Sequence, residues 1–262
     1  MSNSFIYKNI EIHYSELGKG KVVVLLHGFL ENLSMWNYFS KELSKKYRVI
    51  CIDLFGHGET ESYGYIHTME EQAKMVKAIL DHINVRKYIL VGHSMGGYIS
   101  LSFAKLYPHN IKGLCLMNST GLPDSSEKKL NRDRAISAVK QNHETFVKLA
   151  IPMLFSENNR KIFTSEIQQI TGQALQMTPQ GIAASIEGMK IRENLTSIYK
   201  TAKFPIQLII GKQDPVLEYS DLIEQAKKTE IQVVEFCGGH MSYIEHKDDL
   251  LIALSLFIKT CK

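Results

Sequence analysis

Short runs of β-branched and aliphatic residues without polar alternation recur along this chain of 262 residues. The clearest run is VVVLL at residues 22–26. An uninterrupted apolar run of this length is typical of a strand covered on both faces, as in a parallel sheet. Further strand-like segments occupy residues 4–7, 9–14, 48–54, 88–92, 111–118, 206–211 and 231–236.

Segments with helical periodicity separate these runs. In residues 69–83 the apolar side chains fall on one stripe, and Thr68 and Glu71 predict a capping box at the start of that helix. Buried strands that alternate with amphipathic helices indicate an α/β fold. We therefore expect a doubly wound, mostly parallel sheet of about eight strands.

The alternation stops in residues 122–202, which contain no convincing strand. Helical patterns there lie near residues 126–142, 144–154, 166–176 and 179–192. Thr178 and Pro179 form a helix start signal, with an N-cap followed by proline at the first helical position. We expect a core made of residues 1–121 and 203–262, interrupted by a helical insertion.

The composition excludes several classes of protein. With 44% hydrophobic and 22% charged residues the chain can bury a large core, so disorder is excluded. The net charge is only +4, and no basic block predicts nucleic-acid binding. No apolar run is long enough to span a membrane, and the N-terminal residues do not resemble a signal peptide. We therefore expect a cytoplasmic protein.

Four cysteines are present, and none of them forms a Cys-x-x-Cys pair. Cys51, Cys115 and Cys237 lie in apolar runs, where a lone cysteine behaves as a small hydrophobic residue. A disulfide scaffold and a zinc ribbon are therefore not expected.

The sequence GHSMG at residues 92–96 fits the pattern Gly-x-Ser-x-Gly. It follows the predicted strand 88–92 and opens a helical segment. A serine at such a strand-to-helix turn has an exposed hydroxyl, and the glycines leave room for the tight turn. The pattern predicts that Ser94 is a nucleophile. The backbone N–H of Met95, at the start of the helix, is expected to stabilise the negative charge on the carbonyl oxygen.

A serine hydroxyl needs a nearby base to take its proton. His240 is the first candidate, because it lies in a Gly-Gly-His turn just past the predicted strand 231–236. Loops that follow parallel strands share the sheet edge that carries ligands. His27 and His57 also follow strands and are rivals. The other candidates look like surface or loop residues: His13, His67, His82, His109, His143 and His246.

The base in turn needs an acidic partner that fixes its tautomer. Asp214 follows the predicted strand 206–211, and the order Ser94, Asp214, His240 is the order found in hydrolases. The preceding strand ends at Asn118, which cannot act as a carboxylate, and Asp124 is a weaker alternative. We predict Asp214 as the acid.

Asp53 lies close to His57 and could be mistaken for a metal ligand. Loop hydrogen bonding explains an aspartate before a glycine-rich turn, and no third ligand has suitable spacing. The glycines also do not form a phosphate-binding loop. The sequence therefore predicts no metal site and no cofactor.

Several motifs, in chain order, resemble those of the α/β-hydrolase superfamily, and the resemblance covers nearly the whole chain. They are LHGF at 26–29, DLFGHGET at 53–60, the Ser94 turn, GKQDPV at 211–216 and GGHM at 238–241. The resemblance implies that the helical insertion is a cap. It also implies that the Phe29 N–H is the second oxyanion donor, and that His27 and His57 are structural.

The resemblance also narrows the reaction. The dehalogenase and epoxide hydrolase branches have aspartate at the position of Ser94, so serine favours acyl transfer. A menaquinone-pathway synthase branch uses the same three residue types but has arginine just past Ser-x-Gly-Gly, where this chain has Tyr98. We expect a serine hydrolase that cleaves a small carboxylic ester, thioester or lactone. A carbon–carbon bond hydrolase, a perhydrolase and a ligand-binding receptor remain alternatives.

The expected partner is a small ester-like molecule, and the protein is expected to be a monomer or a homodimer. Apolar side chains near the oxyanion loop, the Ser94 helix and the insertion are candidates for the substrate pocket. We predict this pocket to be lined by Phe29, Tyr98, Met153, Phe155 and Met189.

Overall fold

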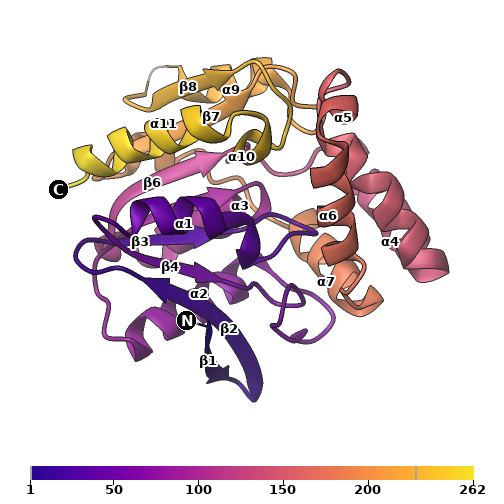
Figure 1. The fold of residues 1–262 in the computed structure, drawn as a ribbon, viewed down its shortest axis with the longest axis horizontal. Coiled ribbons are helices and arrows are strands. Elements are labelled where there is room, and N and C mark those ends of the chain that lie inside the picture. Colours follow the sequence, from indigo (N-terminus) through magenta and orange to yellow (C-terminus); the bar gives the residue numbers. More distant parts are fainter. Residues whose placement is uncertain (1, 228) are drawn as a thin grey trace.

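The computed structural model describes residues 2–227 and 229–262. Its eight strands form one sheet in the order β1-β2-β4-β3-β5-β6-β7-β8 (Figure 1). Strands β3 to β8 are parallel, whereas β2 pairs antiparallel with β1 and with β4. The strands are β1 (Ser2–Tyr7), β2 (Ile10–Leu17), β3 (Val22–Leu26), β4 (Arg48–Ile52), β5 (Tyr88–His93), β6 (Ile111–Met117), β7 (Ile206–Gly211) and β8 (Gln232–Phe236). The predicted, mostly parallel α/β sheet is confirmed.

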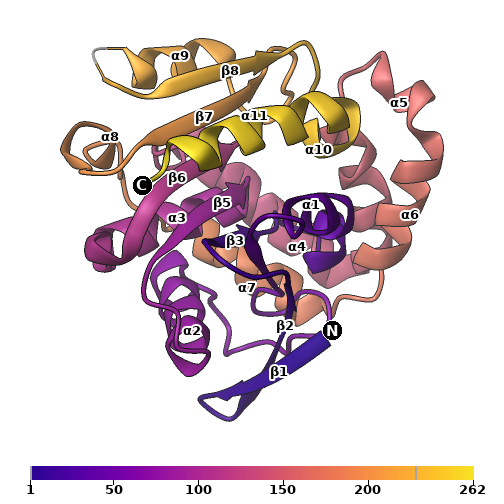
Figure 2. The same cartoon turned by 60° about the vertical axis from the view of Figure 1, so that its left-hand side comes forward.

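Helices cover both faces of the sheet, as a doubly wound fold requires. In Figures 1 and 2, α1 and α11 lie on one face, and α2 and α3 lie on the other. The helices of this part of the chain are α1 (Asn37–Leu43), α2 (Met69–His82), α3 (Met95–Leu106), α9 (Tyr219–Ala226), α10 (Ser242–Glu245) and α11 (Lys247–Thr260).

The central strands form the core. Every residue of β3, β5 and β7 is buried, which explains why their sequences lack polar alternation. The edge strand β8 is only partly covered. Cys237 lies just after it and is exposed, so the expectation that it behaves as a buried hydrophobic residue is wrong.

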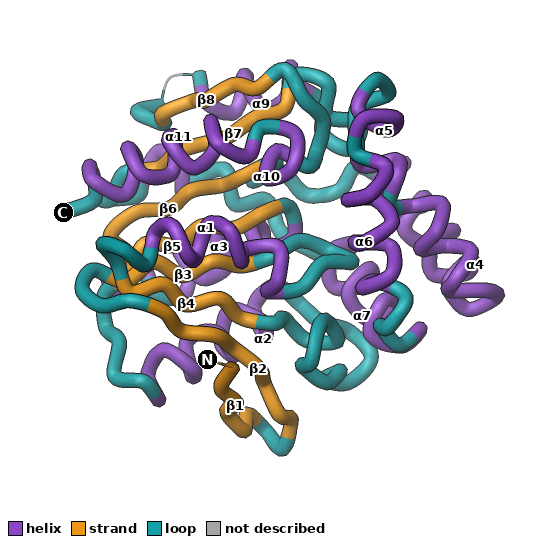
Figure 3. Tube along the Cα trace, viewed as in Figure 1, coloured by secondary structure: helices purple, strands orange, loops and turns teal. Residues whose placement is uncertain are grey.

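Helices occupy the described residues between β6 and β7, with no strand among them. Helices α4 to α7 gather beyond one end of the strands (Figure 3), whereas α8 lies apart from them, near the start of β7 (Figure 2). The helices are α4 (Ser126–Ala150), α5 (Asn159–Ile162), α6 (Thr164–Ala174), α7 (Pro179–Lys190) and α8 (Ile198–Thr201).

Helix α4 is kinked where the sequence predicts a break between two helices. Asn142 leaves the helical region (φ −160°, ψ 94°), and its side chain accepts a hydrogen bond from the Thr145 N–H at 2.9 Å. Asn142 therefore caps the second half of α4. That half ends at Ala150, before the predicted end at Leu154, because Pro152 begins a short 3₁₀ turn.

Two predicted helix starts have different outcomes. Thr178 caps α7 by accepting from the Gly181 N–H at 3.1 Å, as expected. Thr68 likewise accepts from the Glu71 N–H at 3.1 Å, but the Glu71 carboxylate forms ion pairs with Lys8 and Lys74. In the predicted capping box the Glu71 carboxylate would accept from the Thr68 N–H, but here it binds the two lysines.

Within the described ranges, no helix combines the length and apolar character needed to cross a bilayer.

The central sheet makes a prediction about stability. Leu90 is fully buried in β5, between β3 and β6. Truncation of a buried leucine leaves a cavity, so Leu90→Ala should lower the free energy of unfolding by about 2–5 kcal/mol in urea denaturation. Ile6→Ala, at an exposed position of the edge strand β1, should change it by less than about 0.5 kcal/mol. Equal effects of the two substitutions would contradict this account of the core.

Candidate active site

The structure brings Ser94, Asp214 and His240 together at the carboxyl end of the parallel strands. His240 Nε2 lies 2.8 Å from Ser94 Oγ, and His240 Nδ1 lies 2.8 Å from Asp214 Oδ2. The imidazole and the carboxylate are both buried, with side-chain exposures of 3% and 0%. A hydroxyl, an imidazole and a carboxylate thus form one continuous hydrogen-bonded row.

The backbone at Ser94 is strained and crowded. Ser94 has φ +49° and ψ −113°, a conformation that non-glycine residues rarely adopt. A Cβ atom on Gly92 would lie 2.3 Å from the Gly96 carbonyl oxygen, and one on Gly96 would lie 2.4 Å from the Leu26 carbonyl oxygen. Glycine is therefore required on both sides of the turn. The Ser119 hydroxyl donates to the Ser94 carbonyl at 2.8 Å and supports the strained residue.

Asp214 is held as a carboxylate. Its Oδ1 accepts hydrogen bonds from the backbone N–H groups of Val216 (2.8 Å) and Leu217 (3.0 Å). Burial alone would raise the pKa of Asp214, but the facing His240 and these hydrogen bonds lower it below the ordinary value. Because the carboxylate accepts from Nδ1–H, His240 Nε2 is free to accept the Ser94 proton.

Asn118 and Asp124 have other roles than that of the acid. Asn118 Nδ2 donates to Asp214 Oδ2 and to the Gly239 carbonyl, both at 3.1 Å, so it links the aspartate to the histidine loop. The Asp124 carboxylate is paired with Arg132 at 3.0 Å and Arg192 at 2.7 Å. Asp214 is therefore the carboxylate that faces His240.

The two rival histidines are bound within loops. His27 Nε2 accepts from the Leu54 N–H at 3.0 Å, and His57 Nδ1 lies 2.9 Å from the Phe55 carbonyl. Burial lowers the pKa of His57 to about 4, so its ring is neutral.

Asp53 accepts from two backbone N–H groups of its surrounding loops, those of Leu33 and Glu59. No cluster of His, Cys, Asp or Glu suited to a metal ion occurs in the part of the chain described here.

The predicted oxyanion donors follow two neighbouring strands. Met95 is the first residue of α3, where backbone N–H groups have no partner within the helix. Phe29 follows β3 and is partly buried, with its ring edge-on to His57 at 6.1 Å. Because β3 and β5 are adjacent and parallel, both residues lie at the same end of the sheet.

The predicted pocket residues are distributed unevenly. Phe155 is buried beside the histidine loop, since the His240 N–H donates to the Leu154 carbonyl at 2.9 Å. Tyr98 is buried in α3 under the Arg192 guanidinium, 4.2 Å from its ring centre, and Met189 is buried in α7. Met153, in contrast, is 55% exposed.

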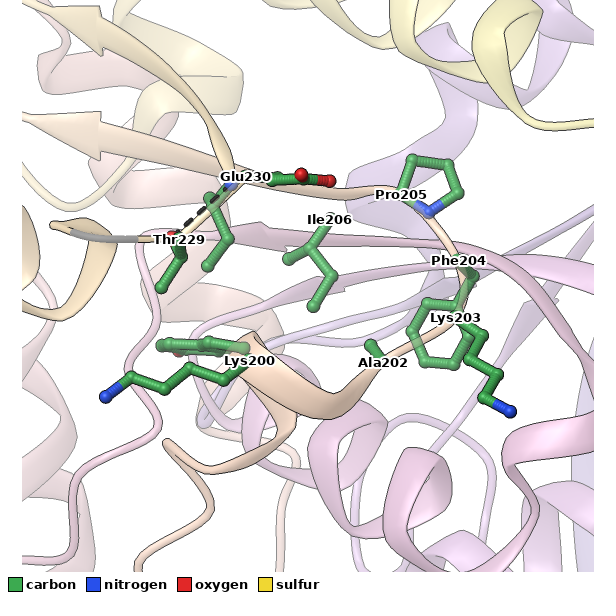
Figure 4. Close-up of a pocket in the computed structure, with 10 residues that line it drawn as sticks. Lys200, Ala202, Lys203, Phe204, Pro205, Ile206, Thr229 and Glu230 are labelled. Atoms are coloured by element: carbon green, nitrogen blue, oxygen red, sulfur yellow. Dashed lines mark hydrogen bonds between the residues drawn. The ribbon is translucent and has the colours of Figure 1, made fainter.

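A hollow of about 710 Å³ lies elsewhere, near the starts of β7 and β8 (Figure 4). Lys200, Lys203 and Glu230 are among its lining residues. None of the predicted site residues lines it, so it is separate from the Ser94 turn.

Three buried polar residues escaped the sequence analysis. Glu31 and His93 form a close pair at 2.7 Å beside the Ser94 turn. His67, expected at the surface or in a loop, lies in the loop before α2, but it is fully buried and not at the surface. Its Nε2 accepts from the Tyr63 N–H at 3.2 Å, and its Nδ1 lies 3.1 Å from the Ser185 hydroxyl of α7. The only sequence feature that could have indicated the burial of His67 was its position directly before Thr68, the N-cap of α2.

Comparison with known proteins assigns the family. The model of the alpha/beta hydrolase fold family matches residues 21–247. A thermophilic esterase from Thermogutta terrifontis, solved with malate bound, superposes with a TM-score of 0.90 at 27% identity, over 100% of this chain and 99% of that one. The chain therefore belongs to the alpha/beta hydrolase fold family, and it is an enzyme of the α/β hydrolase class.

Two curated relatives differ in the reactions that their names state. A monoacylglycerol lipase of Homo sapiens is 26% identical over 82% of this chain and 69% of its own length. A Bacillus subtilis protein that carries the name of a 2-succinyl-6-hydroxy-2,4-cyclohexadiene-1-carboxylate synthase is 32% identical over 74% of each chain. The chain spans about two thirds of the length of relatives such as the lipase.

Buried His67 predicts a pH effect on stability. Burial lowers its pKa from 6.5 to about 3, so between these values the unfolded chain binds a proton that the folded protein excludes. This residue therefore lowers stability as pH falls below 6.5, by about 2 kcal/mol at pH 5. In His67→Gln the loss of stability between pH 7.5 and pH 5, measured by urea denaturation, should be smaller by about that amount. His82→Gln, at an exposed histidine, is the control, and identical pH dependence in both variants would disprove the assignment.

Proposed function

We propose that this enzyme is a serine hydrolase that cleaves small carboxylic esters through an acyl-enzyme. The observation that carries the proposal is the row of 2.8 Å contacts from Ser94 through His240 to Asp214. The esterase of Thermogutta terrifontis, similar over its full length, and the human lipase support a reaction on esters.

The first half of the proposed reaction forms a bond between Ser94 Oγ and the ester carbonyl carbon. His240 Nε2 takes the hydroxyl proton as Oγ attacks, and the carbonyl oxygen becomes negatively charged. The backbone N–H groups of Phe29 and Met95 are proposed to bind this oxygen, a contribution of about 2.7–4 kcal/mol per donor. His240 then gives the proton to the departing alkoxide, and an acyl-serine and an alcohol result.

In the second half, water replaces the alcohol. His240 Nε2 removes a proton from the water as its oxygen attacks the acyl carbon, and the bond to Ser94 Oγ breaks while Oγ regains a proton. Asp214 accepts the Nδ1–H bond throughout, so it stabilises the imidazolium that forms twice in each cycle. The carboxylic acid is then released, and these steps need no cofactor.

Residues 122–202 are proposed to act as a cap over this site. The Leu154 carbonyl accepts from the His240 N–H at 2.9 Å, and Glu245 accepts from the Asn159 amide at 2.7 Å and from the Gly239 N–H at 2.6 Å. These contacts support direct packing of the helical segment on the histidine loop. Such packing excludes water from the Ser94 hydroxyl and strengthens the electrostatic interactions around it.

The relative with the synthase name favours a second candidate, a reaction that yields a cyclohexadiene carboxylate. Arg192 supplies a guanidinium close to Tyr98, the position at which the resembling synthase branch has arginine. However, this guanidinium already pairs with Asp124 and donates to the Leu122 and Met189 carbonyls. We therefore prefer the ester reaction. Faster turnover of vinylogous diketones than of esters would instead favour the carbon–carbon bond hydrolase.

The main prediction concerns the nucleophile and its partner. With a short-chain p-nitrophenyl ester, Ser94→Ala should lower kcat by at least about 10⁴-fold, and Asp214→Asn by about 10⁴-fold because the imidazole loses its correct tautomer. A fluorophosphonate should label the wild type and leave Ser94→Ala unlabelled. Ser102→Ala, at a buried serine of the same helix, should remain active. Equal turnover by wild type and Ser94→Ala would rule out the proposal, and an unlabelled wild type would favour a ligand-binding receptor.

A second prediction separates the proposed pocket residues. Met189 is buried in α7, whereas Met153 is exposed, so the two methionines form a matched pair. If Met189 lines the acyl pocket, Met189→Ala enlarges the pocket and should shift the preferred acyl chain towards longer esters. Met153→Ala should leave the profile of kcat/KM against chain length unchanged. The reverse result would place the pocket wall at Met153.

A further inference from the structure

A buried carboxylate–imidazole pair lies next to the Ser94 turn. Glu31 belongs to the loop after β3, and His93 is the last residue of β5. Glu31 Oε2 is 2.7 Å from His93 Nδ1, and the side chains are only 2% and 1% exposed. Burial of two ionisable groups is costly unless both are well matched. Neither group has a part in the proposed reaction, so their placement needs another explanation.

The pair links three loops that meet at the site. Glu31 Oε2 also accepts a hydrogen bond from the Gly28 N–H at 2.6 Å, next to Phe29 in the first loop. His93 directly precedes the nucleophile in the second loop. Its Nε2 lies 2.9 Å from the backbone carbonyl oxygen of His240 in the third loop. A continuous chain of hydrogen bonds therefore runs across all three.

These partners fix the orientation of the His93 ring. A carbonyl oxygen only accepts, so Nε2 must carry a hydrogen. Nδ1 faces the Glu31 carboxyl group, and although burial opposes the charge, Glu31 raises the pKa of His93 above its ordinary value. The rings of His240 and Tyr243 pack around His93 at 5.2 Å and 5.6 Å. The imidazole thus has little freedom to turn.

Gly28 makes this arrangement possible. A Cβ atom at residue 28 would lie 2.5 Å from Glu31 Oε2 and 2.7 Å from His93 Nδ1. Any side chain there would force the pair apart or move the loop. The requirement for glycine after His27 is therefore explained by the pair.

We propose that Glu31 and His93 are positioning residues that hold the Phe29 N–H and the His240 imidazole in register with the Ser94 hydroxyl. The inference rests on the proposed ester hydrolysis. Misplacement of reacting groups by about 1 Å can cost about 10²-fold in rate. Loss of the pair should therefore act mainly on kcat.

Three substitutions of Glu31 separate geometry from charge. Glu31→Gln keeps the length, and its amide oxygen, in the place of Oε2, can accept both from the Gly28 N–H and from a protonated His93 Nδ1, so kcat should stay within about 3-fold of wild type. Glu31→Asp keeps the charge but is too short to reach both partners, and kcat should fall about 10-fold. Glu31→Met removes both bonds, and kcat should fall about 100-fold. KM should change less than about 3-fold in all three.

The assay uses the full chain with a p-nitrophenyl ester. The concentration of active sites is determined by titration with a fluorophosphonate, and kcat is calculated from that concentration. Glu16→Gln is the matched control. Glu16 forms an ion pair with Arg48 at 2.8 Å, and Arg48 is the first residue of β4, at the end of the strand away from the site. This substitution should leave kcat unchanged. If Glu31→Met does not fold, the comparison of Glu31→Asp with Glu31→Gln decides.

A wild-type value of kcat in Glu31→Asp, or Glu31→Gln as impaired as Glu31→Asp, overturns the positioning role while the ester reaction stands. A wild type that neither hydrolyses the ester nor reacts with the fluorophosphonate overturns the proposed function, and this inference falls with it.

Discussion

The common direction of six strands is the constraint on which the site depends. Because β5, β7 and β8 are parallel, the residues that follow them leave the sheet at one edge. Ser94 and His240 are 146 positions apart in the chain, yet their side chains meet at 2.8 Å. In an antiparallel sheet, neighbouring strands would deliver these loops to opposite edges. The hydrogen-bonded row is thus a consequence of strand direction, and the local sequence only supplies the residue types.

Close backbone approach is the second condition. At this edge the chain is so crowded that a Cβ at residue 92 or 96 would collide with nearby backbone, and one at residue 28 would collide with the Glu31 and His93 side chains. The crowding also stabilises the strained Ser94, because the neighbouring loop supplies the Ser119 hydroxyl that binds its carbonyl. Strain at one residue is tolerated when the surrounding structure fixes it from several sides. The glycines, the strain and the position of the Ser94 hydroxyl are therefore aspects of one packing arrangement.

Features encoded by nearby residues could be predicted from the sequence. The apolar runs gave β3 and β7 at their observed limits, and Thr178 with Pro179 gave the start of α7. Burial produced by segments far away in the chain could not be predicted in this way. His67 is buried because α7, more than a hundred positions later, packs against it through Ser185. Glu31 and His93 likewise look like ordinary loop and motif residues until the fold joins them.

The helical segment between β6 and β7 contacts the core at two separate places. Its middle part is bound to the histidine loop and to α10, through the Leu154 carbonyl and through Asn159, whose amide donates to Glu245. Its late part packs on the His67 loop, where the His67 N–H donates to the Ala184 carbonyl at 2.9 Å and a Cβ on Gly188 would lie 1.8 Å from the His67 carbonyl oxygen. A rigid outward swing of the whole segment would break both attachments.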